Sequence, residues 1–167
     1  VKKDISFFDV HIKGGSKMLS TTVKLACETA KKYNKPEPVI LGVTLLSSFG
    51  QKTLTTELSV NKNIDDYVGS LAKIAVDAGL NGVVASASEA IVIRKECPED
   101  FIIVCPAIRP TWSVVNDQVR VVTPTDAVLS GVDYMVVGRP VICAENKVEA
   151  IKLIIDEIEN ALALDVV

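Results

Sequence analysis

The stretch Asp133–Val141, DYMVVGRPV, ends an apolar run on a glycine and an arginine. A second apolar run, FIIVCPAI at Phe101–Ile108, is followed directly by Arg109. Glycine lets a backbone approach an anion closely, and the guanidinium of arginine is a planar, permanently charged fork that matches phosphate oxygens. Gly138, Arg139 and Arg109 are therefore candidates for holding a phosphate group.

Simpler roles fit some of these polar residues. Arg139 could form a salt bridge with Asp133 or Glu145, and the spacing alone leaves this alternative and the phosphate open. The single histidine, His11, is expected to orient a neighbour through a hydrogen bond, because the chain has no second histidine for a relay. Lys13 lies beside a glycine pair that could help to hold an anion, although a solvated loop lysine is the commoner case.

Short apolar runs that are rich in β-branched residues predict buried strands. Their nearly continuous apolar character is typical of a parallel sheet that is covered on both faces. Helical patterns lie between the runs, so the order of elements predicts a parallel α/β fold, either doubly wound or a (β/α)8 barrel. The predicted strands are Ile5–His11, Pro38–Leu46, Asn81–Ser86, Phe101–Ile108 and Asp133–Gly138, and the predicted helices are Ser16–Lys32, Asn63–Gly79, Ser88–Cys97, Pro124–Ser130 and Asn146–Ala163.

In parallel α/β folds the ligand binds at the carboxyl ends of the strands. We therefore expect the residues that follow each predicted strand to converge on one rim of the sheet. The longest irregular stretch, residues 110–122, is expected to be a functional loop rather than slack chain. The residues that follow the five strands are His11, Ser47 with Ser48, Ser86, Arg109, and Gly138 with Arg139.

Composition limits the class of protein. With 167 residues, 49% of them hydrophobic, the chain is expected to form a single domain over residues 1–167. A net charge of −3 provides no basic surface for nucleic acid, and no apolar run approaches the roughly 20 residues that span a bilayer. The four cysteines form no Cys-x-x-Cys pair, so we expect no zinc site. Reduced thiols and the lack of a secretory leader favour the cytoplasm.

Successive segments of the chain resemble the motifs of bacterial orotidine 5′-phosphate decarboxylases. They are DVHIKGGSKML, LGVTLLSS, AGLNGVVASASEA, CPAIRP and NDQVRVVTPTDAVLSGVDYMVVGRPV, of which the last is the most specific. The resemblance covers nearly all of this chain but only about the last two thirds of the family's chain. It implies a (β/α)8 TIM barrel, of which this chain would form a partial barrel of about five β/α units, strands four to eight.

The resemblance also implies an activity and a set of binding residues. The family converts orotidine monophosphate to uridine monophosphate and CO2 in pyrimidine biosynthesis, with no cofactor or metal, as a homodimer that uses neither nucleic acid nor membrane. This implies that the chain is part of a carboxy-lyase that binds a nucleotide. The substrate-binding residues implied are Arg109, Gly138 and Arg139 at the phosphate, Gln118 from a lid loop, and Ser47 at the pyrimidine ring.

The departures from the family pattern concern the catalytic residues. The family relies on a lysine and an Asp-x-Lys-x-x-Asp array, and this sequence contains no such array. The resemblance places Val1 just before the fourth strand, so we expect no catalytic residue here, and Lys13 is the nearest substitute for the missing ammonium. Ala107 stands where the family usually has glycine.

Two functions therefore stay open. The chain would be the phosphate- and nucleotide-binding half of the decarboxylase, or else a non-catalytic nucleotide-phosphate-binding or assembly fragment. A metal-dependent barrel enzyme for sugar phosphates is disfavoured, because no carboxylates cluster at the predicted strand ends. Five strands cannot close an eight-stranded barrel, so we expect association with a missing segment, self-association through strand edges, or an incomplete copy of a longer chain.

Overall fold

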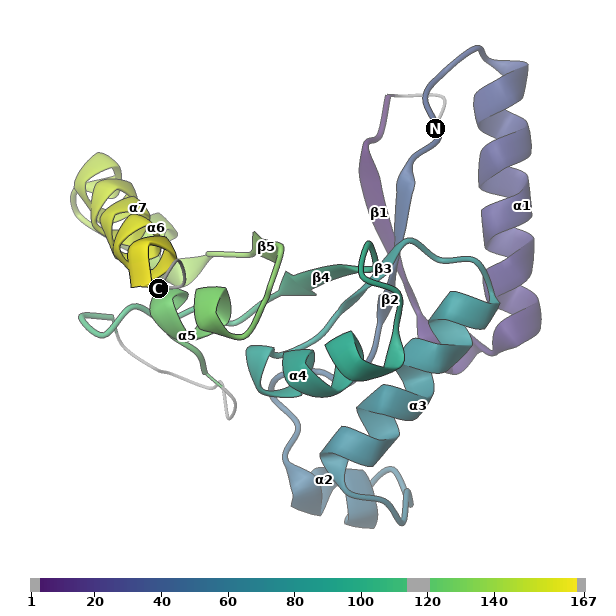
Figure 1. Cartoon of the computed structure of the whole chain (residues 1–167), viewed down its shortest axis with the longest axis horizontal. Coiled ribbons are helices and arrows are strands. Elements are labelled where there is room, and N and C mark those ends of the chain that lie inside the picture. The colour runs from purple at the N-terminus through teal and green to yellow at the C-terminus, as the bar shows by residue number, and fades with distance from the viewer. Residues whose placement is uncertain (1–3, 114–120, 165–167) are drawn as a thin grey trace.

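The computed structural model describes residues 4–113 and 121–164, which alternate between strands and helices (Figure 1). The strands are β1 (Phe7–His11), β2 (Val39–Val43), β3 (Gly82–Val84), β4 (Ile102–Cys105) and β5 (Tyr134–Met135). The helices are the 3₁₀ turn η1 (Ile12–Gly14), α1 (Ser16–Lys32), α2 (Gln51–Thr56), α3 (Ile64–Asp77), α4 (Ala87–Glu96), α5 (Pro124–Leu129), α6 (Arg139–Ile142) and α7 (Lys147–Leu164).

The strands form one sheet in the order β1-β2-β3-β4-β5, and every pair is parallel. Each strand predicted from the sequence is present, so the parallel α/β prediction is confirmed. The strands β2 to β5 are shorter than predicted mainly because their last residues turn away into loops, whereas β1 ends at His11 as predicted and begins two residues later, at Phe7. In particular, β5 ends at Met135, so Gly138 and Arg139 follow it by a short loop rather than closing the strand.

The long helices were predicted within a few residues of their observed bounds, because their ends carry clear signals. Asn63 caps α3 by accepting a hydrogen bond from the Asp66 amide. At the other end of α3, Gly79 has φ +81°, and the amides of Gly79 and Leu80 return to the carbonyls of Val76 and Ala75. The short helices α2 and α6 were missed, because six and four residues are too few to show a helical period.

Most of the core lies on the helix side of the sheet. In β1, Phe8 and Val10 pack into a large apolar cluster, whereas Phe7, Asp9 and His11 on the other side of the strand are exposed. Buried side chains of β2, β3, β4, α1, α3 and α4 complete this cluster. A smaller cluster, centred on Ala87, Cys105, Ile108 and Ala127, underlies the C-terminal part of the chain. Cys105 is therefore a core residue, as its apolar context indicates.

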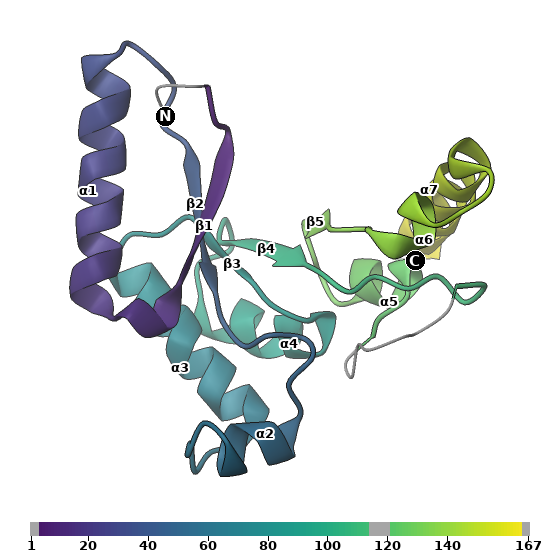
Figure 2. The same cartoon turned by 180° about the vertical axis from the view of Figure 1, so that it is seen from behind.

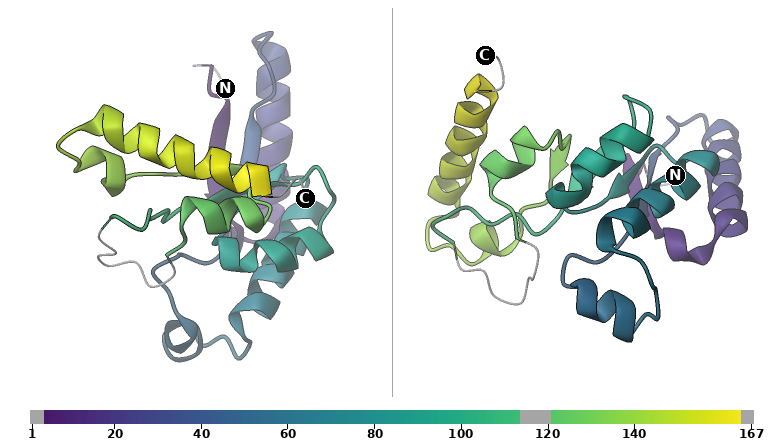
Figure 3. Two further views of the ribbon diagram at one scale, coloured as in Figure 1. Left: turned by 60° about the vertical axis from the view of Figure 1, so that its left-hand side comes forward. Right: turned by 60° about the horizontal axis from the view of Figure 1, so that its bottom comes forward.

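The molecule is elongated along the sheet. Figure 2 and the right-hand view of Figure 3 show α1 at one end of the molecule and α7 at the other, with the sheet between them. Helix α7 packs on α5 and α6 rather than on the large cluster. No helix within residues 4–113 and 121–164 combines the length and the apolar character needed to cross a membrane.

The sheet is strongly curved. β1 and β5 are its two outermost strands, four strand-to-strand steps apart, which in a flat sheet is roughly 19 Å. Nevertheless the rings of Phe7 in β1 and Tyr134 in β5 meet edge to face, with 5.4 Å between their centroids. The two edges therefore face each other across the concave side of the sheet.

An ion pair holds β5 against β4 at the start of both strands. Nη2 of Arg94 donates to Oδ2 of Asp133 at 2.6 Å, and the same carboxylate oxygen accepts from the Ile103 amide at 2.6 Å. The Arg94 guanidinium also donates to the carbonyls of Phe101 and Gly131, at 2.6 and 2.8 Å. One arginine thus connects α4, β4 and the segment that leads into β5.

We predict that Arg94→Ala lowers the free energy of unfolding by about 2 kcal/mol, because charge-assisted hydrogen bonds to partly covered acceptors are lost. Urea denaturation followed by circular dichroism measures the change. The control is Lys24→Ala, which removes an exposed ion pair to Glu28 at 3.9 Å and should change stability by less than about 0.5 kcal/mol. Equal losses in the two variants would contradict the assignment of Arg94 as the connector.

Candidate functional site

The parallel registers place the carboxyl ends of all five strands along one edge of the sheet. Ser47 follows β2, Arg109 follows β4, and Gly138 with Arg139 follows β5. The strands β4 and β5 are direct neighbours, paired through Val104 with Tyr134 and Cys105 with Met135. The two arginines are therefore carried by adjacent strand ends.

Arg109 is held firmly in the loop after β4. Ile108 forms a parallel bridge with Val122, and the Arg109 amide donates to the Val122 carbonyl at 2.8 Å. The side chain is only 6% exposed, and its Nη1 donates to the Ile108 carbonyl at 2.8 Å. Arginine is rarely buried in proteins, and burial of its guanidinium costs free energy unless the N–H groups donate hydrogen bonds. This environment suits a fixed anion-binding group better than a solvated one.

The turn that leads to Arg109 contains a residue in an unfavourable conformation. Ala107 has φ +62°, in the left-handed region that only glycine adopts without cost. This backbone conformation favours glycine, the residue that the family resemblance leads us to expect at this position. Ala107 is accommodated at the expense of local strain, since a Cβ in this region lies too close to the carbonyl that follows.

Gly138 and Arg139 form the start of α6. Gly138 is the N-cap residue, and its carbonyl accepts from the amides of Val141 and Ile142, each at 3.0 Å. A Cβ built on Gly138 would meet no atom within 4 Å, so the backbone there borders open space. Arg139 is half-buried. Asp133, one of the two carboxylates considered as its partner, is paired with Arg94.

Ser47 lies in a tight turn after β2. The Phe49 amide donates to the Leu46 carbonyl at 2.9 Å, which places Ser47 at the second position of the turn. The Lys13 ammonium lies 5.9 Å from the centroid of the Phe49 ring and 6.0 Å from that of Tyr67. Burial raises the pKa of Tyr67, so its ring stays neutral beside this cation. Lys13 is exposed, so it remains a solvated loop lysine, and it contacts the ring of Phe49 beside the turn that carries Ser47.

Sequence reasoning missed a buried carboxylate after β3. Glu89 is 1% exposed, and its carboxylate accepts from the Ser86 amide and the Ser88 hydroxyl, each at 2.9 Å. The Ser-x-x-Glu spacing from Ser86 to Glu89 is the capping-box pattern, which was the available signal. Ser86, expected on the rim, follows β3 and is buried as the N-cap residue of α4. Thr44, directly after β2, connects this strand to the end of β3, because its hydroxyl donates to the Val84 carbonyl at 2.9 Å.

Two residues predicted at the strand ends and in the lid loop, His11 and Gln118, add little to the description of the site. His11 is exposed at the end of β1 and shares the concave side of the sheet with Asp9. Gln118, the predicted lid residue, lies outside the described residues. Among those that are described, no group of three or more His, Cys, Asp or Glu side chains is arranged to hold a metal ion. The guanidinium groups placed after β4 and β5 are groups that bind anions.

Comparison with known proteins gives one consistent result. Residues 2–154 match the family model described as "Orotidine 5'-phosphate decarboxylase / HUMPS family". Curated relatives named orotidine 5′-phosphate decarboxylase include those of Heliobacterium modesticaldum, 38% identical over 97% of this chain and 67% of that protein, and Moorella thermoacetica, 39% identical over 95% of this chain and 63% of that protein.

A solved structure agrees with these sequence matches. The crystal structure of orotidine 5′-phosphate decarboxylase from Lactobacillus acidophilus superposes with a TM-score of 0.75 at 30% identity, over 94% of this chain and 65% of that chain. The chain therefore spans about two thirds of the length of the proteins it matches. The fold is that of a partial TIM barrel of five β/α units, as the resemblance implied.

We predict that Ala107→Gly raises the free energy of unfolding by about 1 kcal/mol, because glycine relieves the left-handed strain at this position. Ala90→Gly is the control: Ala90 is fully buried within α4, and there the same change should lower stability by about 1 kcal/mol. Urea denaturation measures both variants. Destabilisation by Ala107→Gly would show that the turn before Arg109 is not strained.

Proposed function

Because the chain belongs to the orotidine 5′-phosphate decarboxylase / HUMPS family, we propose that it supplies the phosphate- and nucleotide-binding half of an orotidine 5′-phosphate decarboxylase, a carboxy-lyase of pyrimidine biosynthesis. The observation that carries the proposal is the position of Arg109 and Arg139 after two paired parallel strands, β4 and β5. The substrate would be orotidine monophosphate and the product uridine monophosphate.

The phosphate would be held by both arginines and the backbone at Gly138. The buried position of Arg109 supports this role, because a guanidinium in a region of low dielectric attracts a dianion more strongly than one in water. Open space beside Gly138 supports a close approach of the phosphate to the backbone. Each charge-assisted hydrogen bond would contribute about 1.5–3 kcal/mol.

The remaining predicted residues would hold the nucleoside. Ser47 would donate or accept a hydrogen bond at the pyrimidine ring, since its turn follows β2 at the same edge of the sheet. Gln118 would reach the nucleotide from the loop after β4. These contacts would fix the ring in relation to the phosphate, which is how binding energy away from the reacting bond assists catalysis.

The proton chemistry needs groups that these residues do not provide. Loss of CO2 leaves a carbanion on the pyrimidine ring, and a positioned ammonium must stabilise and then protonate it. The sequence contains no Asp-x-Lys-x-x-Asp array to supply that ammonium. Lys13 is exposed and lies beside the rings of Phe49 and Tyr67. The residues of this chain would therefore bind and orient the substrate, and the catalytic lysine and aspartates would come from outside its sequence.

The lack of an Asp-x-Lys-x-x-Asp array in the sequence also supports a second function, a nucleotide-phosphate-binding or assembly module without catalysis. We also propose that the working form contains two copies and lies in the cytoplasm, as the family resemblance implies. Incubation with orotidine monophosphate, followed by the fall in ultraviolet absorbance, separates the functions when it is done with and without an added polypeptide that carries the Asp-x-Lys-x-x-Asp array. For the chain alone we expect no turnover above background, whereas turnover that Lys13→Met abolishes would show that the chain carries its own ammonium. Turnover in the mixture would support the decarboxylase half, and no turnover there would support the module without catalysis.

We predict that the chain binds uridine monophosphate and that Arg139→Ala weakens the affinity at least about tenfold, through loss of a charge-assisted contact. Isothermal titration calorimetry measures the dissociation constants. Lys24→Ala, which removes an exposed cation on α1, is the control and should bind like the parent. No binding by the parent, or equal affinity of the Arg139 variant, would refute the phosphate site.

Gly138→Ala tests the backbone approach separately from the charge. The added methyl meets no protein atom within 4 Å, so stability should change by less than about 0.5 kcal/mol. A phosphate against this backbone would be displaced, and we expect the affinity for uridine monophosphate to fall about tenfold. Unchanged affinity together with unchanged stability would place the phosphate elsewhere.

A further inference from the structure

We propose that Glu157 of α7 is a positioning residue for the phosphate site, because it connects the segment that holds Arg109 to the helix that follows Arg139. The inference deepens the proposed function and rests on it, since these two arginines are the groups assigned to the phosphate. Glu157 lies beyond residues 2–154, the part of the chain that matches the family model.

Glu157 occupies a position at which helix packing favours an apolar residue. Ala150, Ile154 and Ala161 are the buried residues of α7, with exposed fractions of 4%, 5% and 1%. Glu157 stands between Ile154 and Ala161 at the same spacing of three and four residues, so it shares their face of the helix. It is half-buried there. A carboxylate in such a place costs free energy unless it accepts hydrogen bonds, so the donors that it meets indicate its role.

The Glu157 carboxylate accepts hydrogen bonds from the first turn of α5. Its Oε1 accepts from the Thr125 hydroxyl at 3.1 Å and from the Thr125 amide at 3.3 Å. Thr125 is the second residue of α5, where a backbone amide has no partner within its own helix. The residue before it, Pro124, has no amide hydrogen, and the amide after it, of Asp126, donates to the Thr123 hydroxyl at 3.1 Å. Glu157 therefore supplies the acceptor that this turn lacks.

The turn that Glu157 holds leads directly to Arg109. Val122 lies three residues ahead of Thr125. It pairs with Ile108 in a parallel bridge, and its carbonyl accepts from the Arg109 amide at 2.8 Å. Movement of the first turn of α5 would therefore move the backbone to which Arg109 is bonded.

Helix α7 is connected just as closely to Arg139. Four residues join α6, which begins at Arg139, to α7, and the two helices pack against each other. Asn146 caps α7, since its side-chain oxygen accepts from the Glu149 amide at 3.1 Å. Glu157 lies ten residues along α7, about 15 Å from its start. A rigid helix therefore joins the Arg139 segment to the point of contact with α5.

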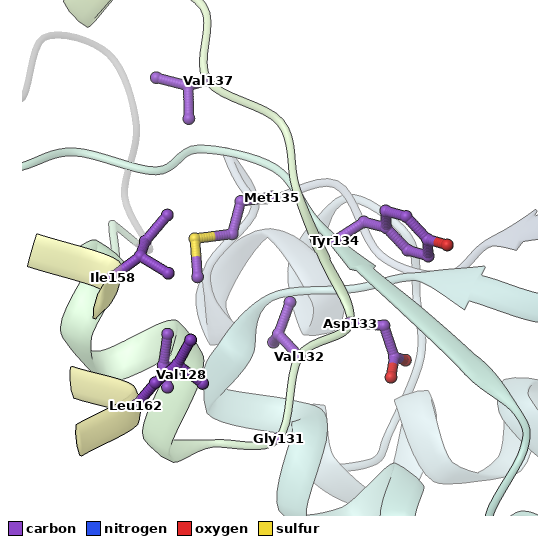
Figure 4. Close-up of a pocket in the computed structure, with 9 residues that line it drawn as sticks. All are labelled: Val128, Gly131, Val132, Asp133, Tyr134, Met135, Val137, Ile158 and Leu162. Atoms are coloured by element: carbon purple, nitrogen blue, oxygen red, sulfur yellow. The ribbon is translucent and has the colours of Figure 1, made fainter. Parts of the chain in front are cut away.

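The other contacts between these segments constrain them less. The strands β4 and β5 pair through two residue pairs. In Figure 4, Met135 of β5 points toward Ile158 of α7 across a cavity of about 550 Å³, which Val128 of α5 and Leu162 of α7 also line. Apolar contacts have no preferred direction, and those that border a cavity leave room for sliding. The two hydrogen bonds to Thr125 are directional, so they define the position of α7 on α5.

Hydrogen exchange of single amides, measured by nuclear magnetic resonance, tests the connection without nucleotide. In Glu157→Ala the Arg109 amide should exchange faster, because its acceptor belongs to the segment that is released. The acceleration should exceed that of the Leu71 amide, in the middle of α3, by at least about fivefold. Equal acceleration of the two amides would show a general loss of stability and would overturn the proposal, as would unchanged exchange of the Arg109 amide.

Affinity for uridine monophosphate tests the consequence for the phosphate site. Glu157→Ala should weaken binding about fivefold, whereas the affinity for uridine, which lacks the phosphate, should stay within about twofold of the parent. Glu157→Gln keeps a carbonyl oxygen that can accept from Thr125, and it should restore most of the affinity. The control is Glu159→Ala, which removes an exposed carboxylate from the same helix and should bind like the parent. Equal losses for nucleotide and nucleoside, or an equal loss in the control, would overturn the proposal.

A double-mutant cycle assigns the effect to the hydrogen bonds with Thr125. Thr125→Val removes the hydroxyl donor and keeps a side chain of similar size. If Glu157 acts through Thr125, the double variant should bind uridine monophosphate no more weakly than Glu157→Ala alone. Losses that multiply would show that Glu157 acts by another route and would overturn the proposal. No binding by the parent would refute the proposed function, whereas selective acceleration of the Arg109 amide would still support the positioning of Arg109 by Glu157.

Discussion

The parallel pairing of β4 with β5 is the contact on which the candidate site depends. It brings Arg109 and Arg139 to adjacent strand ends, although 29 intervening positions separate them in the sequence. The pairing itself is short, with two residue pairs, and it is supported by the Arg94–Asp133 ion pair at the opposite end of the strands. The charges that stabilise the fold and those assigned to the ligand thus lie at opposite ends of the same strand pair. This separation agrees with the general rule for barrels, in which ligand-binding residues lie at the carboxyl ends of the strands and stabilising residues at the opposite ends.

The concave side of the sheet accounts for several of the apolar side chains that are exposed to solvent. Phe7 and Tyr134 at the edges are 41% and 51% exposed, whereas Leu41 and Val104 in the middle are 5% and 8% exposed. A five-stranded sheet with two unpaired edges in the described residues covers its own centre but not its outer strands.

Much of the fold was predictable from the sequence because local signals were strong. The apolar runs located every strand, and the caps at Asn63, Gly79 and Thr123 located helix ends. The strand ends were overestimated, since an apolar run such as MVVG continues into a loop that packs on the core. The short helix at Arg139 was missed for lack of a period, so the sequence placed this arginine directly after a strand rather than at a helix start.

The site was predictable in its residues but not in its environment. A sequence does not show that Arg109 is buried, that Ala107 is strained, or that Lys13 lies over two rings, because these depend on segments that meet only in the folded chain. Glu89 could have been found by its capping-box spacing, whereas its complete burial could not.

The central claim, that two guanidinium groups share one phosphate, is tested most directly by a double-mutant cycle on Arg109→Gln and Arg139→Ala, with affinities for uridine monophosphate and for uridine measured in parallel. The account predicts that the two losses are not additive for the nucleotide, with a coupling of about 1 kcal/mol, and that uridine affinity is unaffected. Additive losses, or equal losses for the nucleotide and the uncharged nucleoside, would contradict it.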